Sequence, residues 1–177
     1  MAFEDFLAIL KKSTQHQHFY HFTERKNLDS IRKHGLLCTA ELKKRGLFDK
    51  VVPGGDANSQ ASDHETGTDE YVCLCFTDEH PMSHVAKEQG RIEDPVYLRI
   101  DPAIIEAEGV MITAAPSNQK GVEHIPAAKG LSGLDLEVLY TRMDWKQRPI
   151  YDRLAVARKY EILVPKSVAL KYIAHGL

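Results

Sequence analysis

Apolar side chains near the N-terminus repeat at the spacing i, i+3, i+4, i+7, which predicts an amphipathic helix over residues 2–12. The positions that carry this repeat are Phe3, Phe6, Leu7 and Leu10. Residues 13–18 are polar and form a predicted connector. The helix and connector together form an N-terminal element, residues 1–18, ahead of one domain over residues 19–177.

Short unbroken apolar runs further along the chain predict β-strands. These runs lie at residues 19–22, 71–76, 95–100, 109–113, 160–164 and 169–173. Short helices are expected between them, including one from an N-cap at Thr23 to a stop at Gly35 and one from Pro81 to Gly90. Other short helices are expected at residues 40–45, 134–140 and 150–157. Strands and short helices without regular βαβ alternation indicate an α+β fold.

Two long segments show little hydrophobic pattern. Residues 53–70 are rich in Gly, Ser, Asn, Asp and Thr, which predicts a loop. A loop of this length is uncommon in a compact domain and is usually functional or mobile. Residues 114–133 are also expected to be rich in loops.

The charge is distributed unevenly along the 177 residues, although the net charge is only −2. Residues 1–50 carry ten Lys/Arg and six Asp/Glu, residues 51–108 carry three and thirteen, and residues 109–177 carry ten and six. This balance argues against binding of duplex nucleic acid through one broad basic face. A nucleic-acid partner would be held in a local groove, through weak and salt-sensitive contacts.

The three cysteines, Cys38, Cys73 and Cys75, are expected to be free thiols in a reducing cytoplasm. Cys73 and Cys75 lie two apart in a predicted strand and should share a face. The N-terminus has neither a basic segment nor a long apolar segment typical of a signal peptide. No apolar run approaches the ~20 residues that span a membrane. We therefore expect a cytoplasmic protein with no membrane partner.

The common cofactor and metal motifs are absent from the sequence. It contains no glycine-rich dinucleotide or phosphate loop of the usual spacing. His80 and His84 have the i, i+4 spacing of zinc helices, but the glutamate that should follow the first histidine is replaced by Pro81. We therefore expect no metal.

Three residues attract attention because of their surroundings, and each has an ordinary structural interpretation. Glu161 starts an apolar strand, where pattern alone favours a salt bridge to Arg158 or Lys159. His21 lies between aromatic residues, which favours a hydrogen-bonded core histidine. Tyr71 alone would be interpreted as a core residue.

Three segments in order carry a family resemblance. The first is Tyr20-His21-x-Thr23-x-x-x-Asn27-Leu28-x-x-Ile31-x-x-x-Gly35-Leu36-Leu37. The second is Asp69-x-Tyr71-Val72-x-x-x-Phe76 followed by His80-Pro81-Met82, and the third is Glu161-Ile-Leu-Val164-Pro165. Together they resemble the DarT family of nucleic-acid ADP-ribosyltransferase toxins, although His80 stands where that family has serine.

The resemblance implies the small ADP-ribosyltransferase fold, an α+β fold with a split central β-sheet and short flanking helices. It implies transfer of ADP-ribose from NAD⁺ to a base in single-stranded DNA, with release of nicotinamide and no metal. It also implies the toxin of a toxin–antitoxin or phage-defence system, with an antitoxin protein as partner. The alternatives are ADP-ribosylation of RNA or of a protein side chain, and a non-catalytic module that binds NAD⁺ or a partner.

The resemblance also implies roles for individual residues. Glu161 would be catalytic, since loss of nicotinamide builds an oxocarbenium-like ribose that a carboxylate stabilises. Arg45, the only arginine between Leu37 and Tyr71, would contact the pyrophosphate and assist the acceptor. The alternative for Arg45 is a solvated cation at a helix C-terminus. The expected NAD⁺-binding residues are His21, Phe22, Thr23, Asn27, Ser30, Leu37 and Tyr71.

The family's acceptor-choosing loop corresponds to about residues 113–160 of this chain. Within it, Asn118 is a candidate polar contact, and Trp145 or Tyr140 is a candidate for stacking on a base. Both aromatic residues have the alternative interpretation of core residues.

Overall fold

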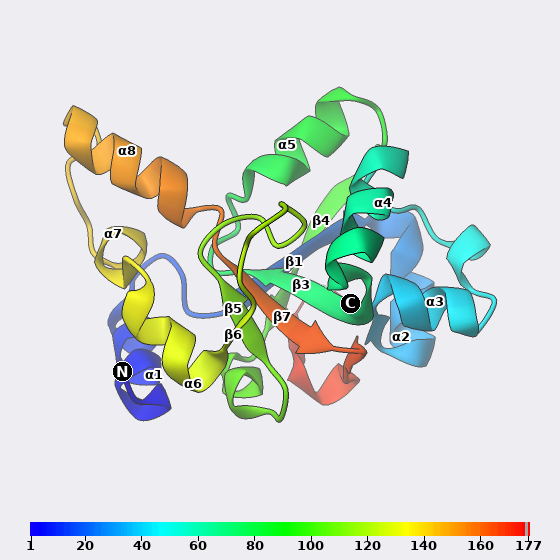
Figure 1. The fold of residues 1–177 in the computed structure, drawn as a ribbon, viewed down its shortest axis with the longest axis horizontal. Helices are drawn as coiled ribbons and strands as arrows, with labels where there is room; N and C mark the ends of the chain where they lie inside the picture. Colours follow the sequence, from blue (N-terminus) through cyan, green and yellow to red (C-terminus); the bar gives the residue numbers. More distant parts are fainter. Residues whose placement is uncertain (176) are drawn as a thin grey trace.

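The computed structural model describes residues 1–175 and 177. Over these residues the chain forms a seven-stranded antiparallel sheet in the order β6-β5-β7-β3-β1-β4-β9, and a separate β2-β8 ribbon. Helices α2, α3 and α4 gather on one side of the sheet in Figure 1, and α1, α6, α7 and α8 lie on the other.

The strands and helices have the following bounds. The strands are β1 (Phe19–Glu24), β2 (Leu36–Leu37), β3 (Tyr71–Cys75), β4 (Pro95–Ile100), β5 (Met111–Thr113), β6 (Ile125–Pro126), β7 (Glu161–Pro165), β8 (Ser167–Val168) and β9 (Ile173–His175). The α-helices are α1 (Phe3–Lys12), α2 (Leu28–His34), α3 (Thr39–Lys44), α4 (Ala57–Thr66), α5 (Pro81–Glu88), α6 (Ala127–Gly130), α7 (Leu136–Tyr140) and α8 (Arg148–Ala157). Short 3₁₀ helices are η1 (Arg25–Asn27), η2 (Phe48–Lys50), η3 (Thr68–Glu70), η4 (Pro102–Glu106), η5 (Leu131–Gly133) and η6 (Leu170–Tyr172).

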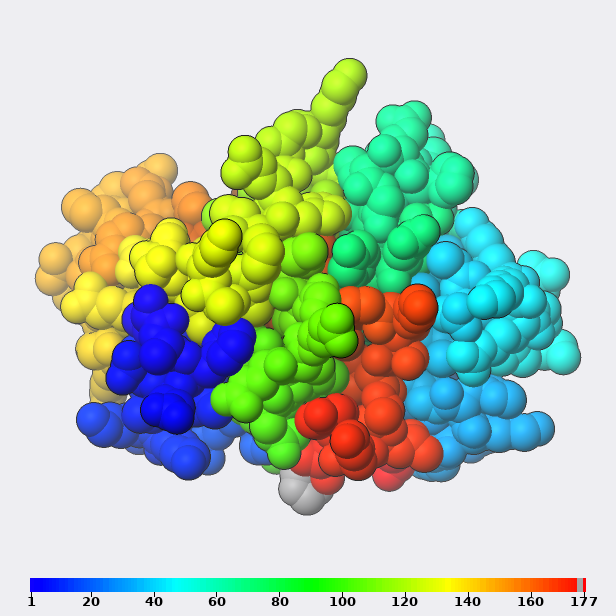
Figure 2. All heavy atoms as spheres, turned by 60° about the horizontal axis from the view of Figure 1, so that its bottom comes forward, coloured from blue at the N-terminus to red at the C-terminus, as the bar shows by residue number. Residues whose placement is uncertain are grey.

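The N-terminal helix is built into the hydrophobic core. Phe6 of α1 is 0% exposed and packs against the rings of Phe19 and Phe76, at centroid distances of 6.0 and 6.2 Å. Figure 2 shows the blue N-terminal segment lying against the yellow and green segments of the chain. Burial of a Phe side chain contributes on the order of 2 kcal/mol, so the predicted amphipathic face of this helix holds it on the sheet.

The central sheet is split between β1 and β3. Strand β1 pairs with β4 along its whole length, from Phe19–Ile100 to Glu24–Pro95. Strand β3 pairs in the same way with β7, from Tyr71–Pro165 to Cys75–Glu161. Between β1 and β3 there is a single bridge, Tyr20–Cys75, after which the two strands part. The predicted split sheet is therefore confirmed, and the split opens a cleft.

Most predicted elements are present, with corrections at specific places. The helix stop at Gly35 is confirmed, since Gly35 has φ 77° directly after α2. Thr23 is not an N-cap as predicted. It lies within β1, and its hydroxyl accepts a hydrogen bond from the Asn27 side chain at 3.0 Å.

Three other segments differ from the prediction. Residues 53–70, predicted as loop, contain α4, whose N-cap Asp56 accepts a hydrogen bond from the Ser59 amide at 2.8 Å. Residues 114–133 contain β6 and α6 as well as loop, and residues 169–173 form η6 and the start of β9. Helix α4 buries none of its residues, so it has no hydrophobic period to detect.

Candidate functional site

The split in the sheet leads into a cleft of about 430 Å³. Its walls come from β1, β3, the start of β7, helices α2–α4 and the turn at residues 116–119. Most of the site residues expected from the sequence line this cleft. They are His21, Phe22, Thr23, Asn27, Ser30, Leu37, Tyr71, Asn118 and Glu161.

Glu161 is a largely buried carboxylate at the start of β7, with its side chain 12% exposed. Its Oε2 accepts a hydrogen bond from the Ser117 amide at 2.8 Å. Over residues 1–175 and 177 it forms no ion pair with Lys or Arg, and Arg158, one of its expected partners, pairs with Glu79 instead. Burial raises the pKa of Glu161, against the opposing effect of the Ser117 hydrogen bonds. A buried carboxylate without a cation in a cleft is typical of a functional group.

His21 reaches into the gap left by the split. Its Nδ1 lies 3.0 Å from the Cys73 carbonyl oxygen, so Nδ1 carries the proton and Nε2 is the acceptor of the neutral ring. Burial lowers the pKa of His21 and keeps the ring neutral. The imidazole therefore donates to a β3 carbonyl that a β1 peptide group would otherwise bind, and its Nε2 can accept a hydrogen bond. His21 is hydrogen-bonded, as its ordinary interpretation expects, and it also lines the cleft.

Asn27 lines the cleft, but its side chain is largely occupied. Its amide donates to the Val52 carbonyl at 2.8 Å and to the Thr23 hydroxyl at 3.0 Å, and its Oδ1 accepts from the Val52 amide at 2.8 Å. Both N–H donors are therefore in use, and one acceptor position is left. In this structure Asn27 ties the segment after η2 to the end of β1, and so shapes one wall.

Arg45 does not line the cleft in this structure. Its side chain, which is 45% exposed, pairs with Glu41 four residues earlier on α3, with Nη2 2.8 Å from Oε2. This arrangement matches the surface alternative for Arg45, and the predicted catalytic role would require the side chain to leave Glu41. The part of the chain described here contributes no Lys or Arg side chain to the cleft lining.

The two candidate stacking residues also lie outside the cleft. Tyr140 is buried in the core and donates its hydroxyl to the Phe76 carbonyl at 3.3 Å. Trp145 is 55% exposed on the segment between α7 and α8. Of the three residues proposed for the acceptor loop, only Asn118 lines the cleft.

Ser117 is the organising residue that sequence reasoning missed. Its amide binds Glu161, and its carbonyl accepts from the Thr68 hydroxyl at 3.2 Å and lies 3.3 Å from the Nε2 of His124. These contacts hold the turn at residues 116–119 beside the carboxylate. The Pro116-Ser117-Asn118 sequence signals a turn, but nothing in it specifies which distant strand the turn meets.

His80 is the second residue beside Glu161, and it is only 2% exposed. It is the N-cap of α5, because its Nδ1 accepts from the Met82 amide at 3.3 Å. Its Nε2 lies 3.6 Å from Glu161 Oε1 and, within the described structure, has no hydrogen-bond partner. Burial lowers the pKa of His80 to about 4, so the ring is neutral and the contact is not an ion pair.

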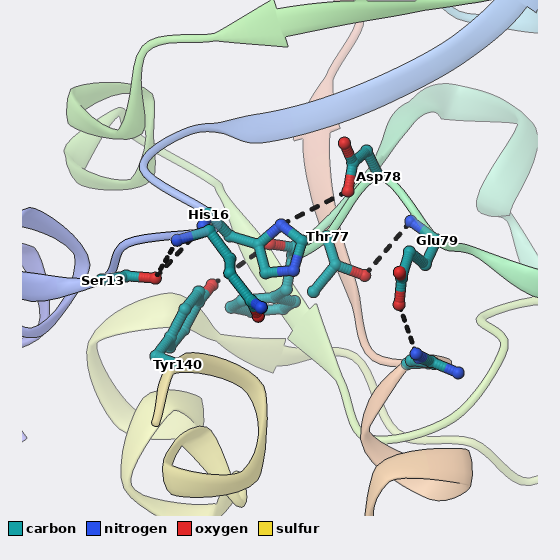
Figure 3. A network of polar contacts seen from close by, with 9 residues as sticks. Ser13, His16, Thr77, Asp78, Glu79 and Tyr140 are labelled. Carbon is teal, nitrogen blue, oxygen red and sulfur yellow. Dashed lines mark hydrogen bonds and ion pairs between the residues drawn. The ribbon is translucent and has the colours of Figure 1, made fainter. Parts of the chain in front are cut away.

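The turn before His80 is held by a separate polar network, shown in Figure 3. His16 lies 3.3 Å from Asp78, and Arg158 pairs with Glu79. The Glu79 amide also donates to the Thr77 hydroxyl at 3.4 Å. These residues border a second pocket of about 320 Å³, so the turn at residues 77–80 separates that pocket from the cleft.

Among the described residues, no group of three or more His, Cys, Asp or Glu side chains is placed to hold a metal ion. Likewise, no helix in that part of the chain is long and apolar enough to cross a membrane.

Comparison with known proteins points to one family. Residues 20–175 match the protein-family model described as "ssDNA thymidine ADP-ribosyltransferase, DarT". Among solved structures, the fold is similar to Thermus sp. 2.9 DarT in complex with ADP-ribosylated ssDNA, with a TM-score of 0.64 and 18% identity over 91% of this chain and 82% of that one. No curated protein sequence matches the chain.

Two other solved structures show the same fold. Thermus sp. 2.9 DarT in complex with NAD⁺ has a TM-score of 0.59 and 19% identity over 88% of this chain and 78% of that one. Thermosipho africanus DarTG in complex with ADP-ribose has a TM-score of 0.62 and 18% identity over 88% of this chain. The match covers 42% of the length of the Thermosipho protein.

Proposed function

The chain belongs to the DarT family of NAD-dependent ADP-ribosyltransferases, and from this premise we propose that its cleft transfers ADP-ribose from NAD⁺ to a base in single-stranded DNA. The observation that carries the proposal is the buried carboxylate of Glu161, unpaired by a cation in the described structure and facing the same cleft as His21. The family description names thymidine, which makes thymine the proposed acceptor base.

The proposed nicotinamide position is the gap between β1 and β3. The two strands part after the Tyr20–Cys75 bridge, so those peptide groups around Phe22 and Thr23 that point toward β3, and not toward β4, have no partner strand. Such peptide groups can hydrogen-bond the amide of nicotinamide as a neighbouring strand would. The neutral His21 ring supplies an acceptor for a ribose hydroxyl, and Tyr71 supplies a ring for stacking.

The proposed chemistry breaks one bond and forms another at the same carbon. The bond between ribose C1′ and the nicotinamide nitrogen breaks, and its electron pair leaves with neutral nicotinamide. The carboxylate of Glu161 stabilises the positive charge that develops on the ribose. A ring nitrogen of the base then bonds to C1′, and the proton from that nitrogen passes to Glu161. The raised pKa of Glu161 suits a proton acceptor.

The acceptor is proposed to be single-stranded because a paired base hides its reactive edge. The proposed substrates favour a cytoplasmic protein, since both NAD⁺ and DNA are present in the cytoplasm. Modified bases would block copying of the template, which supports a toxin role, opposed by an antitoxin and used in phage defence. A non-catalytic binding module would not need an unpaired buried carboxylate, whose burial without a cation is unfavourable.

The test is transfer of label from NAD⁺ to separate pools of single-stranded DNA with and without thymine, of RNA, and of protein. We expect label in thymine-containing DNA alone and no label with Glu161→Gln. The matched control is Glu123→Gln, an exposed glutamate in the segment that follows Ser117, which should label as the wild type does. Label in RNA or protein alone would overturn the acceptor, and full labelling by Glu161→Gln would overturn the mechanism.

A further inference from the structure

His80 lies beside Glu161 but does not form a hydrogen bond to it in the described structure. Its ring is 2% exposed, and Nε2 is a buried atom with no hydrogen-bond partner in the described residues. Buried polar groups in folded proteins are nearly always hydrogen-bonded. An unsatisfied donor that faces a catalytic carboxylate at 3.6 Å therefore needs a reason.

The neighbours of His80 fix which nitrogen carries the proton. Nδ1 accepts from the Met82 amide, so in the neutral ring the proton is on Nε2, the atom nearest Glu161. The ring of Phe22 lies against the imidazole at a centroid distance of 6.3 Å and an interplanar angle of 21°. The His16–Asp78 and Glu79–Arg158 contacts brace the turn that leads into His80 (Figure 3). Tautomer, ring plane and turn are thus all held in place.

From this geometry we infer that His80 is a positioning residue for Glu161: its Nε2–H donates to Oε1 when NAD⁺ is bound and holds the carboxylate toward the ribose. The inference rests on the proposed function of Glu161. A hydrogen bond requires an N···O distance of about 2.7–3.2 Å, so the carboxylate needs to move by roughly half an ångström. Oε2 is already held by Ser117, and the second bond would fix the carboxylate plane.

Other titratable groups beside Glu161 do not supply this contact. Asp63 from α4 is an anion that raises the pKa of Glu161. Cys73 and Cys75 from β3 face the cleft, and burial raises the pKa of both thiols well above the ordinary value, so they stay neutral. Lys159 acts on His80, whose pKa it lowers. His80 is thus the neutral donor, beside Ser117, that the described structure aims at the carboxylate.

Two substitutions separate the two roles of His80, which are the N-cap of α5 and the contact with Glu161. His80→Asn retains an acceptor near the position of Nδ1 and can cap α5, but it has no donor at the position of Nε2. His80→Gln extends a donor toward Glu161 at the expense of the cap. We expect His80→Asn to unfold at nearly the wild-type temperature and to lose about 10- to 100-fold in kcat, the worth of one hydrogen bond to a charged group. His80→Gln should unfold at a lower temperature and recover most of that kcat.

A second readout does not depend on transfer activity. The Nε2–H bond favours the charged carboxylate, so His80→Asn should raise the pKa of Glu161 in the NAD⁺ complex, measured by ¹³C NMR of labelled glutamate. The acid limb of the rate profile should move to higher pH with it. His84→Asn, at an exposed position one turn along α5, is the matched control and should change neither quantity.

The outcomes separate this inference from the proposed function. If wild type transfers ADP-ribose and Glu161→Gln does not, the function holds. If His80→Asn then leaves both kcat and the pKa of Glu161 unchanged, His80 is an N-cap only and the inference is wrong. Equal losses of kcat in His80→Asn and His80→Gln, in proportion to lost stability, would also overturn it.

Discussion

The two pockets on either side of the turn at residues 77–80 use their charged groups in opposite ways. Beside the second pocket, in the network of Figure 3, Glu79 pairs with the cation of Arg158, while Asp78 lies 3.3 Å from His16, whose pKa is lowered by burial. In the cleft, Glu161 is more deeply buried and no cation pairs with it among the described residues. The first arrangement supports the turn, whereas the second leaves a carboxylate available for chemistry.

This difference indicates that an ion pair near the site stabilises the local structure and does not by itself mark a functional residue. Partly exposed pairs contribute about 0–1 kcal/mol and can be lost without loss of the fold. A buried carboxylate without a cation is unfavourable for stability, so it needs another reason to be present. The comparison can therefore be tested by removing one carboxylate from each pocket.

The largest expected effect comes from Glu161→Gln compared with Glu79→Gln. Loss of the Glu161 carboxylate should reduce transfer by at least about 10³-fold, since stabilisation of a developing charge is commonly worth that much. Glu79→Gln keeps the shape of the turn and should reduce transfer by less than about tenfold. Labelled NAD⁺ and thymine-containing single-stranded DNA measure both. Similar losses in the two variants would remove the distinction between the pockets.

Local physical rules predicted much of the fold but less of the site. The amphipathic pattern that ends in Leu10 located α1, and Gly35 located the end of α2, because both signals depend on neighbours in sequence. Hydrophobic periodicity reveals helices that bury one face, and helix α4 buries none of its residues. The capping residue Asp56 alone does not identify it. Patterning thus finds elements that pack, and it overlooks elements that form an exposed wall.

The site residues divide in the same way. The placement of His21 and Glu161 in one cleft could be anticipated from the family resemblance, because both lie in matched segments. The hydrogen bond from Ser117 to Glu161 spans 44 residues and depends on how a loop crosses the sheet. Arg45 stands out in the sequence as the one arginine in its segment, yet the i, i+4 spacing to Glu41 gives it a partner on its own helix.

The next effect concerns His21, one of the histidines that line the cleft. His21→Ala should raise KM for NAD⁺ by about tenfold, the worth of one lost hydrogen bond, with a smaller change in kcat. The Cys73 carbonyl also loses its partner. Steady-state kinetics with varied NAD⁺ measure the split, and His16→Ala in the other pocket is the comparison, with no expected change in KM. A larger rise in KM from His16→Ala than from His21→Ala would indicate that NAD⁺ binds in the second pocket and not in the cleft.

A smaller effect follows from the pH dependence of stability. The pKa of Glu161 in the folded chain is raised above its ordinary value of 4.5, so its ionisation destabilises the fold. The favourable contribution of the neutral acid is complete below pH 4.5 and is lost as pH rises through the raised pKa. Glu161→Gln, which is always neutral, should therefore unfold at a higher temperature than the wild type near pH 7. The gap should close toward pH 4, as measured by thermal denaturation, and a gap that widens on acidification would contradict the assignment.

The smallest effect is expected from Arg45→Gln, a residue of the supporting kind. Its guanidinium pairs with Glu41 outside the cleft, so its loss should change transfer by less than about twofold and leave KM for NAD⁺ unchanged. The matched control is Arg32→Gln, because Arg32 also forms a short-range ion pair within its own helix, with Asp29 on α2. If Arg45→Gln instead lowers kcat by tenfold or more while Arg32→Gln does not, the side chain must leave Glu41 and enter the cleft during the reaction. That result would restore the catalytic role implied by the family resemblance and would show that a surface ion pair can hold a catalytic group in reserve.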